Sequence, residues 1–293
     1  ARIKAGPHEV TAQAVIVATN TPINDRVKLH TKQAPYMTYA LGAAVPKGSV
    51  PSGLYWDTAD PYHYIRLQSL DRDSDLLIVG GEDHKTGQAD DVTERHRRLE
   101  AWARERFPMM HEVAFTWSGQ VMETLDGLAM IGRNPMDADN VYVVTGDSGM
   151  GMTHGTIAGL LISDLILDRP NAWVDLYDPS RKPIRAAGAF LKETGNMAAQ
   201  YTDWVKGGDV KSEDEIAPGE GAVLRHGLGK VAVYREPSGA VHRFSAVCPH
   251  LGCIVTWNAS ADTWDCPCHG SRFDKLGKVV NGPANRDLPA VES

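Results

Sequence analysis

The residues best suited to bind a metal lie between positions 248 and 269. Cys248 and His250 are separated by one residue, Cys266 and His269 by two, and fifteen residues lie between the two pairs. Two thiolates and two imidazoles in this order suit a [2Fe–2S] centre in which cysteines hold one iron and histidines the other. A structural zinc site is the alternative, although a cysteine and a histidine one residue apart are an awkward pair for zinc. Unrelated core cysteines are a poor explanation, since all four cysteines of the chain fall within 21 residues.

The segments that contain these residues, Cys248–Cys253 and Cys266–Ser271, resemble the two cluster-binding loops of the Rieske family. The resemblance implies that the cluster ligands are Cys248, His250, Cys266 and His269. It also implies a disulfide between Cys253 and Cys268 that bridges the two loops, as in one branch of the family.

Three further residues are expected around the cluster on the same resemblance. Ser271 matches a hydroxyl that hydrogen-bonds a bridging sulfide, and Pro283 matches a loop that covers the cluster. Phe273 departs from the high-potential respiratory branch, which has a tyrosine two residues after the serine. Because phenylalanine cannot donate a hydrogen bond to the sulfur shell, the reduced cluster is less stabilised. We therefore expect a lower reduction potential than in the respiratory branch.

The whole chain has the composition of a soluble globular protein. Its 293 residues suffice for two domains, and 42% hydrophobic with 23% charged residues is ordinary for such proteins. The formal net charge of −7 argues against nucleic acid or an anionic membrane as a partner. The sequence has no apolar run of about 18 residues and no recognisable signal peptide. We therefore expect a cytoplasmic protein.

The first part of the chain predicts a mixed domain of helices and strands over residues 1–183. Residues 2–14 suggest a hairpin, and Ala14–Ala18 suggests a fully buried strand of a parallel sheet. A helix is predicted from Val92 to Phe107, behind a capping box formed by Asp91 and Glu94. Alternating stretches predict antiparallel strands at 37–43, 54–57, 62–67, 75–80 and 114–119.

A strand, a glycine-rich turn and a helix follow one another between residues 140 and 168. Asn140–Thr145 suggests a second buried strand, Gly146–Gly155 supplies the glycines, and the helix is predicted over 153–168. This order is the architecture of a nucleotide-phosphate site, because a helix N-terminus attracts phosphate. The glycine spacing is not that of the dinucleotide fingerprint, so a tight packing turn is an equal alternative.

Residues 9–183 as a whole resemble the C-terminal half of the D-amino-acid oxidase and glycine oxidase superfamily of FAD-dependent enzymes. The resemblance is carried by Val15–Asn20, Leu77–Asp83, Trp117–Gly119, Thr124–Asp126, Ile131–Gly132 and Val144–Gly155. It implies that the positive end of the last helix lies beside the flavin ring and stabilises its anionic reduced form. The implied flavin contacts are Gly146, Gly149, Met150, Gly151, Met152 and Thr153.

Two features of that superfamily are missing from the sequence. No G-x-G-x-x-G unit precedes Val15, so FAD is expected in the full-length protein and only weakly on this chain alone. Val121 stands where amino-acid-oxidising members carry the arginine that clamps the substrate carboxylate, so an amino acid is not the expected substrate. Arg66 is a candidate replacement for that arginine, and Asp126 is either functional or a turn aspartate.

The remaining sequence predicts a connector at 184–206 and a Rieske domain at 207–293. The connector has helical composition, with Phe190 and Leu191 as its expected anchors. Glycine-rich turns then separate short strands at 222–224, 230–234 and 241–244. This pattern is typical of a small all-β domain. The fold class is therefore α+β: a partial FAD-binding oxidoreductase domain with an antiparallel sheet, followed by an all-β Rieske domain.

These features together predict an oxidoreductase that binds FAD and a Rieske [2Fe–2S] cluster. An organic, amine-like small molecule would be oxidised, and the cluster would pass single electrons to an unidentified redox partner. The alternative is a non-catalytic electron carrier whose flavin half is degenerate. A Rieske oxygenase is disfavoured, because that class places the Rieske domain first and adds an iron site of two histidines and one carboxylate.

Overall fold

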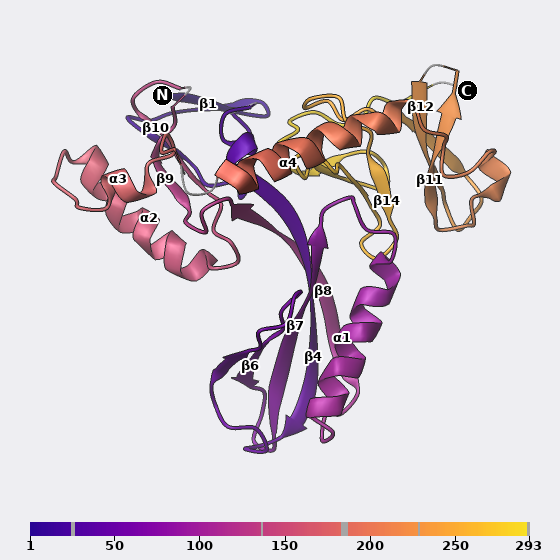
Figure 1. The fold of residues 1–293 in the computed structure, drawn as a ribbon, viewed down its shortest axis with the longest axis horizontal. Coiled ribbons are helices and arrows are strands. Elements are labelled where there is room, and N and C mark those ends of the chain that lie inside the picture. The colour runs from indigo at the N-terminus through magenta and orange to yellow at the C-terminus, as the bar shows by residue number, and fades with distance from the viewer. Residues whose placement is uncertain (25–26, 136, 183–186, 228, 292–293) are drawn as a thin grey trace.

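The computed structural model describes residues 1–24, 27–135, 137–182, 187–227 and 229–291. Three regions stand out in Figure 1: a lobe that carries α2 and α3, a long sheet flanked by α1, and a C-terminal β region. The helix α4 (Ala187–Gln200) crosses from the first lobe toward the C-terminal region. In the part of the chain that is described, no helix combines the length and the apolar character needed to cross a bilayer.

The first lobe is built on a three-stranded sheet in the order β3-β10-β9. The predicted hairpin is formed by β1 (Arg2–Ala5) and β2 (His8–Thr11). In the sheet, β3 (Val15–Val17) runs parallel to β10 (Val141–Thr145), and β9 (Met130–Arg133) pairs antiparallel on the other side. Two helices complete the lobe, α2 (Gly151–Ile166) and α3 (Val174–Tyr177).

The expectation that Ala14–Ala18 is fully buried was wrong, because Ile16 is 51% exposed. The parallel pairing of this strand is as predicted. Since β3 is an edge strand of a small sheet, the buried side chains of α2, Leu161 among them, pack on β9 and β10 instead. A run of apolar β-branched residues therefore predicted the strand but not its burial.

The second region is a five-stranded antiparallel sheet in the order β5-β6-β7-β4-β8. Its strands are β4 (Gln33–Pro46), β5 (Leu54–Trp56), β6 (Tyr64–Ser69), β7 (Ser74–Lys85) and β8 (Val113–Thr124). The helix α1 (Val92–Arg106) packs on β4 and β7, with Leu99 and Ala103 fully buried. The short 3-10 helix η1 (His30–Lys32) leads into β4.

The predicted capping box at the start of α1 does not form. Asp91 is the N-cap residue, but its side chain accepts no hydrogen bond from the first turn of the helix. Its carboxylate instead binds the guanidinium groups of Arg95 at 2.7 Å and Arg98 at 2.8 Å. Charge-assisted hydrogen bonds of this kind are about twice as strong as neutral ones, which explains why they prevail over the backbone N–H groups.

The C-terminal region is all-β, as predicted. Its two antiparallel sheets are β11-β12-β13 and β14-β15-β16-β17. The strands are β11 (Gly221–His226), β12 (Gly229–Arg235), β13 (Val241–Ser245), β14 (Thr256–Asn258), β15 (Thr263–Asp265), β16 (Arg272–Asp274) and β17 (Val279–Asn281). Trp264 and Phe273 face each other in register at its centre and are fully buried. The two cysteine-containing loops join β13 to β14 and β15 to β16.

The connector is helical, but one of its two predicted anchors was wrong. Residues 184–186 and the side chain of Phe190 lie outside the described residues. Leu191 is 72% exposed and therefore anchors nothing. Met197, two helical turns later, packs against the core of the C-terminal region. The 3-10 helices η3 (Tyr201–Trp204) and η4 (Glu213–Glu215) complete the connection.

Candidate functional site

Each of the two cysteine-containing loops closes on itself by backbone hydrogen bonds. In the first loop, Cys248 N–H donates to Cys253 O at 2.8 Å, and Gly252 N–H donates to Cys248 O at 2.9 Å. In the second loop, Cys266 N–H donates to Ser271 O at 2.8 Å. These hydrogen bonds fix the backbone of each loop around its cysteine and histidine residues.

The four predicted ligands are brought together and are enclosed. Cys248 and Cys266 are each 1% exposed and carry free thiols. The hydrogen bond from Cys266 lowers the pKa of Cys248 to about 7, and the same bond, with burial, raises the pKa of Cys266. Burial, followed by the neighbouring rings of His250 and His30, lowers the pKa of His269 to about 3. A neutral imidazole beside a thiol of lowered pKa is a donor set that fits a [2Fe–2S] cluster.

The second pair of cysteines is joined in a disulfide. The structure links Cys253 to Cys268, across the two loops and fifteen residues apart in sequence. The sulfur atoms of Cys253, Cys266 and Cys268 lie within 4.8 Å of one another, but the disulfide leaves Cys266 as the one free thiol of these three. The bridge therefore separates the roles of the cysteines: two are bonded to each other and two face the predicted cluster.

The other residues expected around the cluster lie next to the two cysteine-containing loops or within them. The Ser271 hydroxyl accepts a hydrogen bond from Ala284 N–H at 3.0 Å, which ties the loop of Pro283 to the second cysteine loop. The same hydroxyl contributes to the lowered pKa of Cys248, so it reaches the sulfur ligand. Phe273 is fully buried in the core that contains Cys248 and Cys266.

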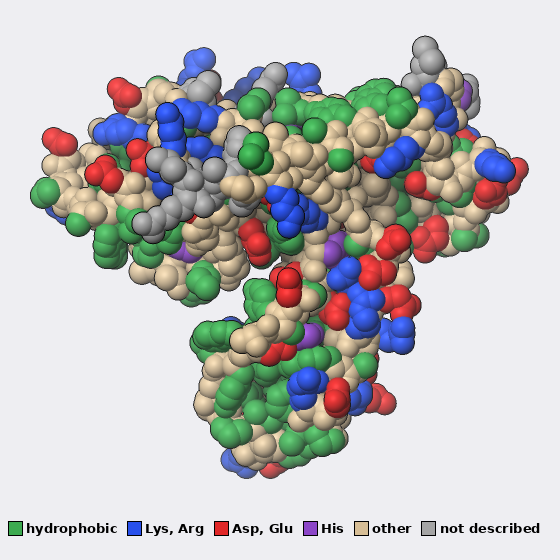
Figure 2. All heavy atoms as spheres, in the orientation of Figure 1, with side chains coloured by type: hydrophobic (Ala, Val, Ile, Leu, Met, Phe, Trp, Pro, Cys, Tyr) green, Lys and Arg blue, Asp and Glu red, His purple; other side chains and the backbone are tan. Residues whose placement is uncertain are grey.

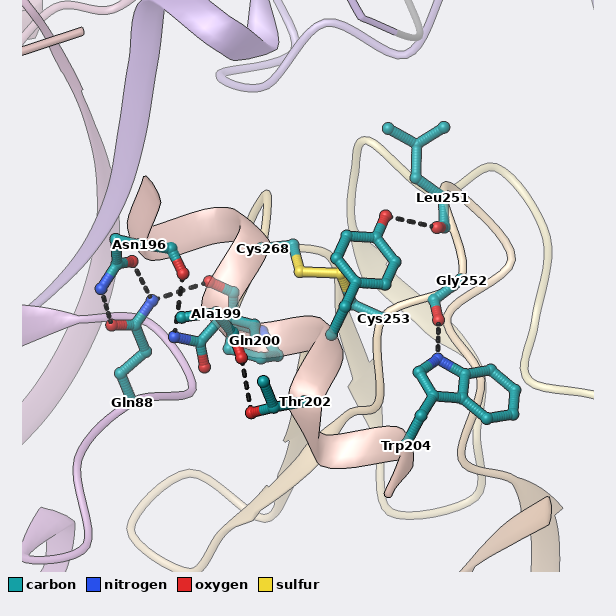
Figure 3. Close-up of a disulfide and its surroundings, with 12 residues drawn as sticks. Gln88, Asn196, Ala199, Gln200, Thr202, Trp204, Leu251, Gly252, Cys253 and Cys268 are labelled. Carbon is teal, nitrogen blue, oxygen red and sulfur yellow. Dashed lines mark hydrogen bonds between the residues drawn. A yellow bond between two sulfur atoms is a disulfide. The ribbon is translucent and has the colours of Figure 1, made fainter. Parts of the chain in front are cut away.

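The connector also holds the first cysteine loop, as Figure 3 shows around the disulfide. Trp204 donates from its indole nitrogen to Gly252 O at 2.9 Å, and the Tyr201 hydroxyl donates to Leu251 O at 2.8 Å. At the other end of the connector, Asn196 exchanges hydrogen bonds with Gln88, at 2.9 and 3.1 Å. The connector therefore contacts both the large sheet and the cluster loop.

His30 of the first half lies directly against the two predicted histidine ligands. Its ring centroid is 5.0 Å from that of His250 and 5.8 Å from that of His269. His30 is 2% exposed, His269 is 4% exposed and His250 is half-buried, so the other half of the chain covers part of the histidine edge of the cluster site. Sequence reasoning missed His30, because a lone histidine before a strand carries no ligand spacing.

The second cysteine loop is also seated on strands of the large sheet. Gln120 on β8 donates from Nε2 to Gly270 O at 3.0 Å. A Cβ placed on Gly270 would lie 2.5 Å from Cβ of Pro35, which is on β4. Gln88 donates to Pro267 O at 3.0 Å on the same side of the loop. The contact between the two halves is therefore close enough to require glycine at position 270.

The residues predicted to contact the flavin surround the start of α2. Met150 is its N-cap residue, no side chain caps the first turn, and Met152 is 89% exposed. Gly149 and Thr153 are exposed as well, and Gly151 opens the helix. The uncapped N–H groups of this turn are available to an anionic group, which fits the predicted flavin contact.

Gly146 differs from the other predicted flavin contacts because it is buried. A Cβ there would lie 2.3 Å from the Thr124 side chain, and its φ is +72°. The residue nevertheless lines a cavity of about 320 Å³ beside the helix N-terminus, together with Gln120 and Val121. A second cavity, of about 460 Å³, lies on the other side of the turn and includes Gly149.

The three residues considered as substrate contacts do not all lie at the cavities. Asp126 forms a two-point ion pair with Arg181, with both bonds at 2.8 Å, so its observed role is to tie a turn to the end of the first half. Val121 lines both cavities at the start of α2. Arg66 is exposed and lines the larger cavity.

The Phe273→Tyr variant is expected to raise the reduction potential of the cluster. A hydrogen bond worth about 1.4 kcal/mol more in the reduced state corresponds to about 60 mV for a one-electron couple. Redox titration followed by the EPR signal of the reduced cluster measures this shift. Phe244→Tyr is the control, because Phe244 lies in the same core but outside the cysteine loops. An unchanged potential in Phe273→Tyr, or an equal rise in the control, would contradict the expectation.

Comparison with known proteins identifies a family for the N-terminal part of the chain and another for the C-terminal part. The profile of the family described as FAD dependent oxidoreductase (DAO) matches residues 2–165, which is more than half of the chain. The chain belongs to this FAD dependent oxidoreductase family. A second profile, that of the Rieske [2Fe-2S] domain, matches residues 206–292. The DAO-type domain is thus followed by a Rieske domain, and the cofactors of the two families are the predicted FAD and [2Fe–2S] cluster.

Similar proteins differ in how much of the chain they match. YhfW of Bacillus subtilis (strain 168), described as a Rieske 2Fe-2S iron-sulfur protein, is 31% identical over 290 residues, 97% of this chain and 56% of the relative. The cytochrome b6-f complex iron-sulfur subunit of Synechococcus elongatus is 40% identical over 148 residues, 48% of this chain and 73% of the relative. Glycine oxidase from Geobacillus kaustophilus covers 60% of this chain and 48% of its own, at 19% identity and a TM-score of 0.49. The chain therefore spans about half of the length of YhfW.

Proposed function

We propose that this chain supplies the substrate-facing and electron-relay parts of an oxidoreductase. The enzyme oxidises an organic, amine-like substrate with FAD and releases the electrons one at a time through its Rieske cluster. When bound, FAD supplies two-electron chemistry and the cluster supplies one-electron chemistry. Oxidation of an amine to an imine releases two electrons and two protons, so a one-electron carrier protein must act twice for each substrate molecule.

The observation that carries this proposal is the position of Gln120. Gln120 is among the residues that line the cavity of about 320 Å³ beside the start of α2, where the flavin contacts are predicted. Its side chain donates to Gly270 O at 3.0 Å, and Gly270 follows the predicted ligand His269. One residue of β8 therefore adjoins both predicted cofactor sites.

Neighbouring groups fix Gln120 in this position. Thr86 donates from Oγ1 to Gln120 Oε1 at 3.0 Å, and Asn20 donates from Nδ2 to Gln120 O at 3.0 Å. With its oxygen occupied by Thr86, the amide of Gln120 presents its nitrogen to Gly270. A residue held at three points is suited to keep two sites at a constant separation.

The position of His30 supports the same proposal. Its ring lies against those of the predicted ligands His250 and His269, and Pro35 of β4 lies close to Gly270. His269 is buried and His250 is half-buried, so this edge of the cluster site is turned toward the flavin half of the chain. Such an orientation favours electron transfer between the two halves of one chain over transfer at an exposed tip.

A rapid-reduction experiment with the holoprotein tests the proposal. FAD is photoreduced under anaerobic conditions, and reduction of the cluster is followed by absorption and EPR. We expect Gln120→Leu to slow cluster reduction at least tenfold while FAD photoreduction is unchanged, because the contact with Gly270 is lost. Gln68→Leu is the control, since Gln68 is an exposed residue of the same sheet.

Two results would count against the proposed function. Cluster reduction at the wild-type rate in Gln120→Leu would show that this residue does not link the sites. A wild-type holoprotein in which photoreduced FAD never reduces the cluster would favour the non-catalytic carrier instead.

A further inference from the structure

The larger cavity beside the start of α2 has the size of a small-molecule site. Its volume is about 460 Å³, within the range of about 300–1,000 Å³ that ligand sites occupy. Figure 2 shows hydrophobic side chains gathered at the bottom of the view, over the part of the long sheet where β6 lies. The lining residues used below are Tyr62, Tyr64, Arg66, Asp83, Thr38 and Gly149.

Two tyrosines line the cavity between the large sheet and the turn that carries the predicted flavin contacts. The rings of Tyr62 and Tyr64 lie 6.2 Å apart at an angle of 42°. The Tyr64 ring lies on the backbone of Gly80, where a Cβ would come within 2.0 Å of Cζ. The Tyr62 hydroxyl lies 3.9 Å from the position that a Cβ on Gly149 would take. A ligand against these rings would therefore adjoin the predicted flavin contacts.

A buried carboxylate atom lies at the inner end of the same cavity. Oδ1 of Asp83 is buried and has no hydrogen-bond partner among the described residues, and the same is true of Oγ1 of Thr38. Burial raises the pKa of Asp83 above its usual range. Burial, and next the charge of Asp83, also raises the pKa of Tyr62 to about 12. Asp83 as a residue is half-buried, and the nearby His63 and Arg95 also favour its charged form. A carboxylate oxygen that is buried without a hydrogen bond costs free energy, and a bound cation would offset that cost.

The distribution of charge in the cavity distinguishes an amine from an amino acid. The position of the superfamily's carboxylate-binding arginine is occupied by Val121, which lines this cavity without charge. The cation that does line it, Arg66, is an exposed residue of β6, two positions after Tyr64 on the same face of the strand. The cavity is therefore lined by two aromatic rings and by a carboxylate with one buried oxygen, which is the chemistry that recognises an ammonium group.

We infer that this cavity binds the ammonium group of a small cationic amine that carries no carboxylate. Asp83 is the counter-ion of the ammonium group, and the rings of Tyr62 and Tyr64 contact its alkyl substituents. The inference rests on the proposed function, because it names the substrate class for the flavin-side site of that enzyme.

Calorimetric titration of the holoprotein with three probes tests the inference. Choline is the cation, 3,3-dimethylbutan-1-ol is its uncharged isostere, and glycine betaine is the analogue with a carboxylate. We expect choline to bind at least tenfold more tightly than either of the other two. Asp83→Asn is expected to weaken choline at least tenfold and to leave the uncharged isostere unaffected.

Control variants keep the test decisive. Asp73→Asn removes a carboxylate from an exposed turn of the same sheet and is expected to leave choline binding unchanged. Tyr62→Leu provides a second test if Asp83→Asn fails to fold, and is expected to reduce the preference for choline over its isostere. Equal binding of choline and the isostere would overturn the inference. Tighter binding of betaine that depends on Arg66 would overturn it as well.

Failure of this inference can be told apart from failure of the proposed function. If choline does not bind while photoreduced FAD still reduces the cluster in the wild-type holoprotein, the substrate class is wrong and the proposed function stands. If photoreduced FAD does not reduce the cluster, the proposed function fails whatever the cavity binds.

Discussion

The Cys266→Ala variant is expected to lose the [2Fe–2S] cluster completely. Cys266 is 1% exposed, carries one of the two free thiols of the described chain, and interacts directly with Cys248. Without it, one iron lacks half of its predicted protein ligands, and no other free thiol of the described residues can replace it. Iron analysis should fall from about two atoms per chain to near zero, with loss of the EPR signal of the reduced cluster.

The matched variant for this experiment changes the other two cysteines. A Cys253→Ser, Cys268→Ser double variant removes the disulfide but keeps all four predicted ligands. Closing a loop of fifteen residues stabilises the folded state by about 3 kcal/mol, so this variant should unfold more easily and still bind iron. Loss of iron in the double variant combined with retention in Cys266→Ala would refute the ligand assignment.

The Gly270→Ala variant is expected to separate the cluster loop from the flavin half. Gly270 has a φ of +75°, and a Cβ there would lie 2.5 Å from Pro35 Cβ and 2.8 Å from Gln120 Nε2. The left-handed backbone costs about 1–2 kcal/mol for alanine. Overpacking against β4 and β8 adds about 1–3 kcal/mol, because Pro35 is part of a paired strand and cannot move freely. Urea unfolding should show both costs, and cluster reduction after FAD photoreduction should slow at least tenfold.

Gly252→Ala is the control for that variant, because it isolates the backbone cost. Gly252 lies in the first cysteine loop with a φ of +81°, and a Cβ there would meet no atom within 4 Å. We expect a loss of about 1–2 kcal/mol and a normal rate of cluster reduction. If the two variants behave alike, the close contact between the halves has no role in electron transfer.

The sequence alone was sufficient to predict the two families. Cysteine and histidine at fixed short spacings specify a metal site locally, because the loop that carries them also sets their geometry. The strands of the large sheet and the place of β3 in a parallel pair followed from side-chain alternation and β-branched runs in the same local way. The profiles that match residues 2–165 and 206–292 agree with this assignment of the two families.

Sequence-based expectations were wrong where the outcome depends on contacts that a local pattern does not specify. Asp91 has the position of a helix cap but binds Arg95 and Arg98 of the same helix. Leu191 has the composition of an anchor but points to solvent. In the first case the guanidinium partners decided the outcome, and in the second the packing of the connector left the side chain exposed.

The sequence by itself thus predicted which residues bind the metal and contact the flavin, since those signals are short and local. Only the tertiary structure decided what surrounds them. His30 is 220 residues before His250 and contacts it, and Gln120 is 150 residues before Gly270 and binds it. Contacts between distant positions leave no spacing in a single sequence, because they arise from the packing of β4, β8 and the cysteine loops. For the same reason, the cavity that Asp83, Tyr62 and Tyr64 line together became recognisable as a candidate site only once the sheet was folded.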